Sequence, residues 1–436
     1  MADSTVNYGF PYPTGGDKVA VHSDIEKLAV AADARDKSLD TRVSTTESKV
    51  TALENPPIRR ASVPLTFSRG TGTDPRPVVT VRIPVKFGAP VKRLKALFRN
   101  YDYRSGQTYT GATRINGVAF GEHQMNADGS MTGLFPTAPT IVSGAMNAPG
   151  DASTFSTGWV EVNAEAGKEY LLSYTVFDDG VDKVYNLGYC FTSTIASGWS
   201  IVGPTTAARQ SFAPLSVNLE VEVDAETPVY AYLGDSMTAG QGATRPGYDS
   251  WANQHARSHG AIAQIYAEPG SSLPQWSDPM DPAWRRFEHH RKPDRLYSLL
   301  GYNDLGNAIT LSGMQTRFSE TMQTALGFVE PNLYLATILP RPEVGPSHTV
   351  QLAFNDWLSS SLPNGAKACL DFYRAVVDPA TETTDLMWRT APNDGHLSTA
   401  GYARLAETTT MPAPTAAAEP APVSVTYVGD GVYEID

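Results

Sequence analysis

The chain has 436 residues, 41% of them hydrophobic, and a formal net charge of −12 at pH 7. This length predicts two or three domains, and the negative charge argues against nonspecific binding to nucleic acid, which depends on clustered cations. No apolar run reaches membrane-spanning length and no secretory signal opens the chain, so we expect a soluble protein made in the cytoplasm. The two cysteines, Cys190 and Cys369, predict buried thiols rather than a disulfide framework.

The N-terminal residues predict a peptide followed by a coiled coil. Residues 1–22 are irregular and rich in Gly, Pro and Tyr, whereas residues 23–57 open on a capping box at Ser23 and Glu26 and contain no Gly or Pro before Pro56. Heptad positions a and d hold Ile25, Ala29, Ala32, Leu39, Val43, Thr46, Val50 and Leu53, with Asp36 as the one violation. The spacing predicts a coiled coil of about four heptads; a lone amphipathic helix packed on its own domain is the alternative.

Residues 58–225 predict an antiparallel β-sandwich that is jelly-roll-like. Alternating apolar runs separated by Gly, Ser, Thr and Asn occur at 78–85, 93–98, 169–177 and 215–223. Many short strands without a long helix are typical of that architecture. The tyrosines at Tyr101, Tyr103 and Tyr109 are expected to be exposed, where they could contact sugars, although packing is the commoner use of such residues.

Residues 226–410 predict an α/β domain with a parallel sheet, because strands alternate with helical stretches. The expected strands lie at 229–233, 261–266, 295–300, 332–339 and 366–372, and the expected helices at 249–258, 350–362 and 399–406. The carboxyl ends of parallel strands meet at one crevice, where such sheets bind ligands. This placement predicts that Ser236, Gly270 and Asn303 lie together.

Four blocks carry chemistry, three at strand ends and the fourth just before the helix expected at 399–406. They read GDSMTAG from Gly234, EPGSS from Glu268, GYND from Gly301 and DGHLSTAGYA from Asp394. Together they resemble the SGNH hydrolases, the GDSL-like esterase and lipase superfamily. The resemblance implies a three-layer, flavodoxin-like α/β fold and a serine esterase that needs no cofactor and no metal.

The same resemblance assigns roles to particular residues. It implies Ser236 as the nucleophile and His396 as the general base, with the Ser236 amide, the Gly270 amide and the Asn303 side-chain amide as oxyanion donors. These residue types suit ester cleavage, because a serine hydroxyl needs an imidazole to take its proton. Fixed donors then stabilise the charge that develops on the carbonyl oxygen.

The residue that orients the histidine departs from the family pattern. The family places an aspartate three residues before the histidine, where this chain has Asn393, and Asp394 lies two before. Either residue could orient the imidazole, or Ser236 and His396 could act nearly as a dyad. We favour Asp394, because a carboxylate also stabilises the imidazolium.

Other polar residues have simpler interpretations. Asp235 is expected to support its loop by hydrogen bonds. His255 and His259 have a spacing that can bind metal, but no further ligand accompanies them, so a surface helix face is favoured. The segment 289–292, His-His-Arg-Lys, is interpreted as a solvated basic patch.

The chain closes with residues 411–436, a Pro/Ala-rich linker and a short β segment. The opening NYGFPYPTGGDKVAVHSDIEKLAVAAD, followed by a coiled coil, a β-domain and a hydrolase, resembles minor tail proteins of phages that infect actinobacteria. This implies a homotrimer in the virion tail, attached to other tail proteins through its N-terminus. It would act outside the host on an acylated surface glycan or lipid.

The predicted function is therefore a serine esterase that removes acyl groups, especially acetyl, from a cell-surface carbohydrate. Two alternatives remain open. One is a receptor-binding tail protein without catalysis, and the other is a lipase or thioesterase that acts on longer acyl chains, because a fold does not fix the substrate.

Overall fold

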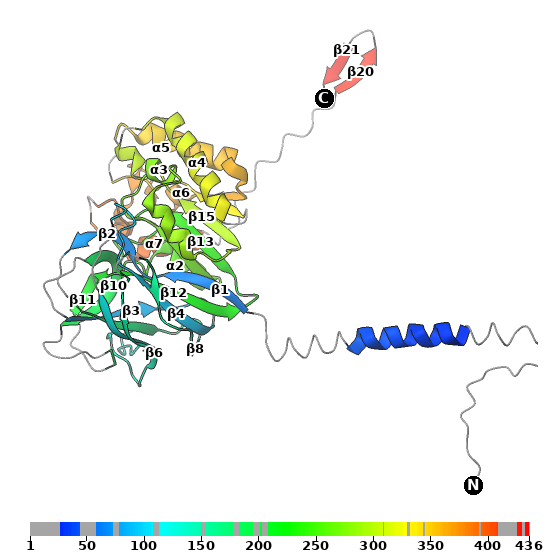
Figure 1. Ribbon diagram of the computed structural model, residues 1–436. Coiled ribbons are helices and arrows are strands. Elements are labelled where there is room, and N and C mark those ends of the chain that lie inside the picture. Colours follow the sequence, from blue (N-terminus) through cyan, green and yellow to red (C-terminus); the bar gives the residue numbers. More distant parts are fainter. Residues whose placement is uncertain are drawn as a thin grey trace, which may run out of the picture. The chain divides into compact units, whose positions relative to one another are not determined.

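The computed structural model separates the chain into two units, Met1–Pro57 and Ile58–Asp436. It describes residues 27–43, 58–72, 78–107, 113–149, 151, 153–177, 183–194, 201–202, 208–307, 309–328, 332–342, 345–391, 394–408, 425–429 and 432–435. In the first unit, residues 27–43 form a helix (Figure 1). All of its residues are exposed. The predicted helix is thus confirmed over this range, whereas the coiled coil stays a prediction. The peptide 1–22 and the heptad positions Ile25, Thr46, Val50 and Leu53 lie outside the described residues.

The first part of the second unit consists of two antiparallel sheets. One has the order β1-β12-β4-β7, with β8 also paired to β4, and the other has the order β11-β10-β3-β9-β5-β6, with β2 paired to β10. The strands are β1 Ile58–Pro64, β2 Phe67–Gly72, β3 Val78–Val85, β4 Val91–Arg99, β5 Arg114–Glu122, β6 Thr140–Asn147, β7 Phe155–Ser156, β8 Val160–Ala164, β9 Tyr170–Phe177, β10 Lys183–Thr194, β11 Ala208–Pro214 and β12 Ser216–Asp224. The four alternating runs all become strands, and the jelly-roll topology stays a prediction.

The core of this β-domain forms where the apolar faces of both sheets meet. Leu94 and Phe98 of β4 are fully buried, and the Phe98 ring meets the Tyr174 ring of β9 edge-on, with 5.1 Å between centroids. Alternation along each strand places these residues inward, as a strand's two-residue period requires. Cys190 and Cys369 are both free thiols in buried positions, which confirms that expectation.

The expectation of exposed tyrosines is wrong for Tyr101 and Tyr103. Each is 3% exposed, and their rings pack edge-on at 5.1 Å. The guanidinium of Arg286, from the part of the chain after residue 225, lies 4.3 Å from the centre of the Tyr103 ring. The loop after β4 therefore packs against a neighbouring segment that local sequence could not reveal, and packing is the role of both rings. Tyr109 lies outside the described residues.

The second part of the unit is a parallel five-stranded sheet in the order β14-β13-β15-β16-β17 (Figure 1). Its strands are β13 Val229–Gly234, β14 Ile262–Ala267, β15 Arg295–Leu299, β16 Leu333–Ala336 and β17 Ala368–Leu370. Its helices are α2 Trp251–Ser258, α3 Leu273–Trp276, α4 Leu311–Phe328, α5 His348–Ser361, α6 Phe372–Val376 and α7 Thr399–Thr408, with 3₁₀ turns η1 Pro282–His289, η2 Asp304–Gly306, η3 Pro363–Gly365 and η4 Leu386–Trp388. Two small hairpins complete the described elements, β18 Val377–Asp378 with β19 Thr383–Thr384 and β20 Val425–Gly429 with β21 Val432–Ile435.

Alternate residues of strand β13, which lies between β14 and β15, point to the two faces of this sheet. Tyr230 and Tyr232 belong to the cluster that contains α2, α6 and α7 residues. Ala231 and Leu233 belong to the cluster that contains α3, α4 and α5 residues. Helices therefore cover both faces, and the five predicted strands are confirmed, although β16 and β17 are shorter than expected. No helix within the described residues is long and apolar enough to span a membrane.

The interpretation of His255 as part of a surface helix face is wrong. His255 is fully buried rather than on a surface face, and its Nδ1 lies 2.6 Å from the Tyr232 hydroxyl of β13. Burial lowers the pKa of His255 to about 3. Among the described residues no group of three metal-ligating side chains forms. The helix face that carries His255 packs on the sheet, and the Nδ1 atom of His255 contacts the Tyr232 hydroxyl inside the core.

The basic segment 289–292 is only partly solvated. His289 Nε2 lies 2.8 Å from the Thr154 hydroxyl of the β-domain, and Arg291 forms an ion pair with the buried Glu220 of β12. The interpretation as a freely solvated patch is therefore wrong for these two residues, because the segment lies against the β-domain.

Candidate active site

Ser236 stands two residues after the end of strand β13, in a tight turn. The turn needs glycine at position 234, because a Cβ there would lie 2.0 Å from Thr238 Oγ1. Asp235 stabilises the turn that follows, because its Oδ1 accepts a hydrogen bond of 2.9 Å from the Met237 amide. This confirms the supporting role expected for Asp235. The turn fixes the Ser236 side chain at the carboxyl edge of the sheet.

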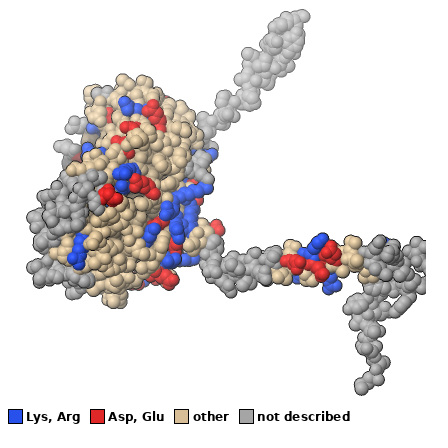
Figure 2. Space-filling view, viewed as in Figure 1, with Lys and Arg blue, Asp and Glu red and all other residues tan. Residues whose placement is uncertain are grey.

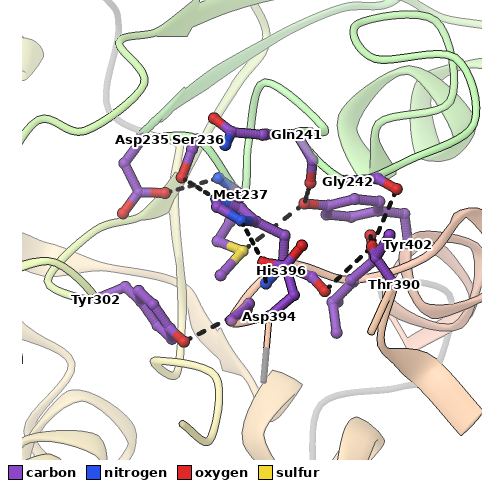
Figure 3. A network of polar contacts seen from close by, with 12 residues as sticks. Asp235, Ser236, Met237, Gln241, Gly242, Tyr302, Thr390, Asp394, His396 and Tyr402 are labelled. Atoms are coloured by element: carbon purple, nitrogen blue, oxygen red, sulfur yellow. Dashed lines mark hydrogen bonds and ion pairs between the residues drawn. The ribbon is translucent and has the colours of Figure 1, made fainter. Parts of the chain in front are cut away.

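The hydroxyl of Ser236 meets the imidazole of His396 although 160 positions separate them in sequence. Ser236 Oγ lies 3.0 Å from His396 Nε2, and His396 Nδ1 lies 2.8 Å from Asp394 Oδ1 (Figure 3). The same carboxylate oxygen accepts a hydrogen bond of 2.9 Å from the His396 backbone amide. Of the three arrangements considered for the histidine, the one with Asp394 is therefore present in the structure. Asn393 lies outside the described residues.

The electrostatics of Asp394 suit this contact. Partial burial acts to raise its pKa, but the hydrogen bonds from the backbone and ring of His396 outweigh that effect and hold the pKa of Asp394 below its usual value. Asp394 is therefore ionised at neutral pH. An ionised carboxylate keeps the proton of the imidazole on Nδ1, which leaves Nε2 free to accept the proton of Ser236.

The loop that carries His396 packs tightly against its surroundings. A Cβ at Gly242 would come within 2.7 Å of the His396 Cβ, and one at Gly395 within 2.5 Å of the Tyr302 hydroxyl. Tyr402 of α7, also drawn in Figure 3, donates a hydrogen bond of 2.7 Å to the Gln241 carbonyl. Sequence reasoning missed Tyr302 and Tyr402 as supports, although both lie inside the motif blocks.

Gly270 and Asn303 lie on adjoining loops. Gly270 has a φ of +81°, a conformation that L side chains rarely adopt, in a turn closed by the Ser271 amide and the Glu268 carbonyl at 3.0 Å. Asn303 donates from Nδ2 to the Ser271 carbonyl at 2.7 Å. The ends of β14 and β15 are thus joined beside the end of β13, and the predicted convergence of the three strand ends is observed.

Asp304 connects the end of β15 to the start of helix α3. Both of its carboxylate oxygens accept hydrogen bonds from the Leu273 amide, at 3.2 and 3.0 Å. Asn303 itself makes no side-chain cap on the 3₁₀ turn that follows. Asn303 and Asp304 therefore do more than turn the chain out of β15, because both side chains reach across to the segment that follows Gly270.

Two buried carboxyl groups lie behind the site. Asp235 is almost fully buried, its Oδ2 has no hydrogen-bond partner among the described residues, and burial raises its pKa to about 7. Burial also raises the pKa of Glu268 to about 7, against the opposing effect of the Arg286 guanidinium at 2.8 Å. Sequence reasoning missed Arg286, which lies in no motif and pairs with Glu268 through the fold alone.

At the carboxyl edge of the parallel sheet, a serine is hydrogen-bonded to an imidazole, which is hydrogen-bonded to a carboxylate. This arrangement is that of a serine hydrolase. Residues 232–404 match the family described as GDSL-like Lipase/Acylhydrolase. This segment is therefore a GDSL-like, SGNH-type domain, and the protein is a serine esterase. No curated protein matches the chain.

Several solved structures are similar to this one. A family two carbohydrate esterase from Clostridium thermocellum, in complex with cellohexaose, has 13% identity and a TM-score of 0.36, covering 80% of this chain and 92% of that chain. One from Cellvibrio japonicus has 13% identity and a TM-score of 0.34, covering 81% and 97%. A member of the lipolytic protein G-D-S-L family from Veillonella parvula DSM 2008 has 15% identity and a TM-score of 0.32, covering 42% and 96%.

Proposed function

We propose that this esterase removes acyl groups, above all acetyl groups, from a cell-surface carbohydrate. The supporting observation is a cavity of about 350 Å³ that both parts of the second unit line. The β-domain contributes Tyr189 and Arg209, and the esterase domain contributes Thr244 and Thr399. Thr399 begins helix α7, three residues after His396, so the cavity adjoins the loop that carries the base.

The cavity suits a sugar better than an acyl chain. Its size lies within the range of small-molecule sites. Its lining combines the Tyr189 ring with hydroxyl and guanidinium groups and with the carboxylates of Asp128 and Asp249, so it offers an apolar face together with hydrogen-bond donors and acceptors. A long acyl chain would instead require a mostly apolar channel. The lipase or thioesterase alternative is therefore the less favoured one.

The proposed reaction proceeds in two steps. His396 takes the proton of Ser236 as Oγ attacks the ester carbonyl carbon, and the amides of Ser236, Gly270 and Asn303 receive the developing oxyanion. When the intermediate collapses, the protonated imidazole gives its proton to the leaving sugar hydroxyl, which leaves an acyl-serine. His396 then activates a water molecule that releases the carboxylate and restores the serine.

The test compares Ser236→Ala with Ser298→Ala. Ser298 is also a buried serine of this sheet, one strand away, so both substitutions remove one buried hydroxyl. Release of acetate from p-nitrophenyl acetate and from acetylated host polysaccharides is measured for both variants. We expect Ser236→Ala to lose at least a thousandfold in kcat and Ser298→Ala to stay active. Equal rates for wild type and Ser236→Ala would overturn the proposal, and a preference for long-chain p-nitrophenyl esters would transfer it to the lipase alternative.

We further propose that the protein is part of a phage tail, as a homotrimer joined to other tail proteins through its N-terminal unit. The resemblance of the first residues to minor tail proteins supports this, as do the exposed apolar side chains of Leu39 and Val43 on the helix 27–43. A receptor-binding tail protein without catalysis is the less favoured alternative, because Asp394 lies 2.8 Å from His396 Nδ1 despite the unusual spacing before the histidine.

Assembly is tested by light scattering of the full chain. We expect a trimer that dissociates in Leu39→Asp and Val43→Asp, which place a charge at heptad positions d and a, with esterase activity retained. Thr41→Asp, at an outward heptad position, is the matched control and should remain trimeric. A wild-type monomer would contradict the proposal.

A further inference from the structure

The β-domain places a cation at the loop that carries Gly270. Arg104 lies in the segment after β4, where its amide donates to Asp102 Oδ1 at 3.0 Å. Three atoms of its guanidinium lie 3.2–3.3 Å from the point where a Cβ on Gly270 would stand. Because Gly270 is a proposed oxyanion donor, this charge lies beside the place where an ester would bind.

A second cation stands on the Asn303 side of the site. Arg341 follows strand β16, and its guanidinium carbon lies 5.4 Å from the centre of the Tyr302 ring. Tyr302 precedes Asn303 in the chain, and its hydroxyl donates to the Gly395 carbonyl, in the loop of His396, at 3.4 Å. Two arginines from separate segments therefore border the same site.

Neither Arg104 nor Arg341 forms an ion pair with any described residue, in contrast to the cations on another part of the surface. Figure 2 shows lysine and arginine side chains gathered over strands β1, β4 and β12. There the cations are ion-paired with carboxylates: Arg60 and Arg93 with Glu222, and Lys95 and Arg291 with Glu220. Those charges are partly neutralised in place, whereas the two at the site remain available to a ligand.

We propose that Arg104 and Arg341 bind a carboxylate of the substrate, so that the preferred substrate is an acylated acidic carbohydrate that contains uronic acid residues. This rests on the proposed esterase function and names its substrate class. A planar guanidinium binds a carboxylate through two parallel hydrogen bonds, with both strength and direction. In a protein of net charge −12, cations at the site also offset the general repulsion of an anionic polymer.

The experiment compares an O-acetylated oligogalacturonide, which is anionic, with an O-acetylated xylo-oligosaccharide, which is neutral. The measured quantity is the ratio of kcat/KM for the anionic over the neutral substrate. We expect this ratio to fall about tenfold in Arg104→Gln and in Arg341→Gln, and to fall for the wild type as salt is added. Arg104→Lys keeps the charge and should lose less than Arg104→Gln.

The matched control is Arg114→Gln. Arg114 lies on β5, its guanidinium carbon is 5.3 Å from the centre of the Phe177 ring, and it too has no ion pair among the described residues. Its substitution should leave the ratio unchanged. An unchanged ratio in both site variants, or an equal fall on the two substrates, would overturn the inference while the esterase function stands. A wild type that cleaves neither sugar ester nor p-nitrophenyl acetate would overturn both.

Discussion

Replacing Asp394 by asparagine tests how the histidine is held. The carboxylate lies 2.8 Å from His396 Nδ1, and its charge matters most in the transition state, when the imidazole becomes positive. Two unit charges at that distance attract by about 6 kcal/mol at an effective dielectric constant of about 20. Because the Asp394 side chain is 35% exposed, screening by solvent reduces this to about 3 kcal/mol. A loss of that size lowers kcat about a hundredfold.

The substitution also changes the tautomer that the site favours. An asparagine amide can donate to Nδ1, which would place the imidazole proton on Nε2, where it faces Ser236 Oγ and blocks proton uptake. The fall in kcat should therefore reach or exceed the electrostatic figure. Single-turnover acylation by p-nitrophenyl acetate is the assay, because it measures the step in which the imidazole first acts as a base.

The matched control is Asp385→Asn. Asp385 also accepts a hydrogen bond from the amide two residues on, that of Met387 at 3.0 Å, as Asp394 does from His396 at 2.9 Å. Both variants therefore change the same kind of turn, and only one changes the histidine. We expect Asp385→Asn to keep kcat within about twofold of wild type, since surface changes away from a site have small effects. If Asp394→Asn keeps kcat within threefold, the assignment of the orienting residue is refuted.

Two further substitutions follow from the buried groups and the strained turn. Gly270→Ala places a Cβ at a residue with a φ of +81°, 3.2 Å from the Arg104 guanidinium. We expect urea unfolding to show a stability loss of about 1 kcal/mol or more. We also expect kcat to change more than KM. Asp235, whose pKa rises by burial from 3.8 to about 7, holds a proton when folded that the unfolded chain releases. Its contribution to stability therefore falls between about pH 4 and 7, by about 4 kcal/mol in all. Asp235→Asn keeps an acceptor for the Met237 amide and should flatten that part of the stability curve. A curve as steep as that of wild type would contradict the burial argument.

Local sequence was informative where each strand ends in a motif. The run before Ser236 is apolar and closes in a glycine, so both the strand β13 and the position of the serine at the carboxyl edge of the sheet follow from residue order. The same logic located Gly270 and Asn303 after β14 and β15. Parallel pairing then brings these ends together without further information, because one edge of the sheet collects all of them.

The remainder depended on contacts that no local pattern encodes. Helix α4 has buried residues at Met314, Phe318, Met322 and Ala325, a helical period that we overlooked rather than one that was absent. In contrast, nothing near His255 indicates that its helix face packs on Tyr232. Nothing near Arg104 indicates that a loop of the β-domain reaches the Gly270 turn. Periodicity shows which side of an element is buried, but not which distant segment covers it.

The contacts between the β-domain and the esterase domain predict that the two unfold together. The amide of Ser62 in β1 donates to Gln264 Oε1 of β14 at 2.8 Å, and Gln264 Nε2 donates to the Arg291 carbonyl at 2.6 Å. Val229 and Ile262, from the first positions of β13 and β14, belong to the core of the β-domain.

Separating the two parts would break the hydrogen bond from Ser62 and leave Gln264 Oε1 only the 3.1 Å bond from the Arg291 amide, at a cost of about 1 kcal/mol. It would also expose two core side chains, at about 1.5–3 kcal/mol each. Together these costs are comparable to the whole stability of a small domain. We therefore expect calorimetry of the full chain to show one transition for Ile58–Asp436, and Gln264→Ala to lower its midpoint without splitting it. Gln254→Ala, on the α2 helix, is the control for loss of a glutamine. Two separate transitions in the wild type would show that the β-domain and the esterase domain unfold independently. The contact between Arg104 and the Gly270 loop could then open while the catalytic residues stay folded.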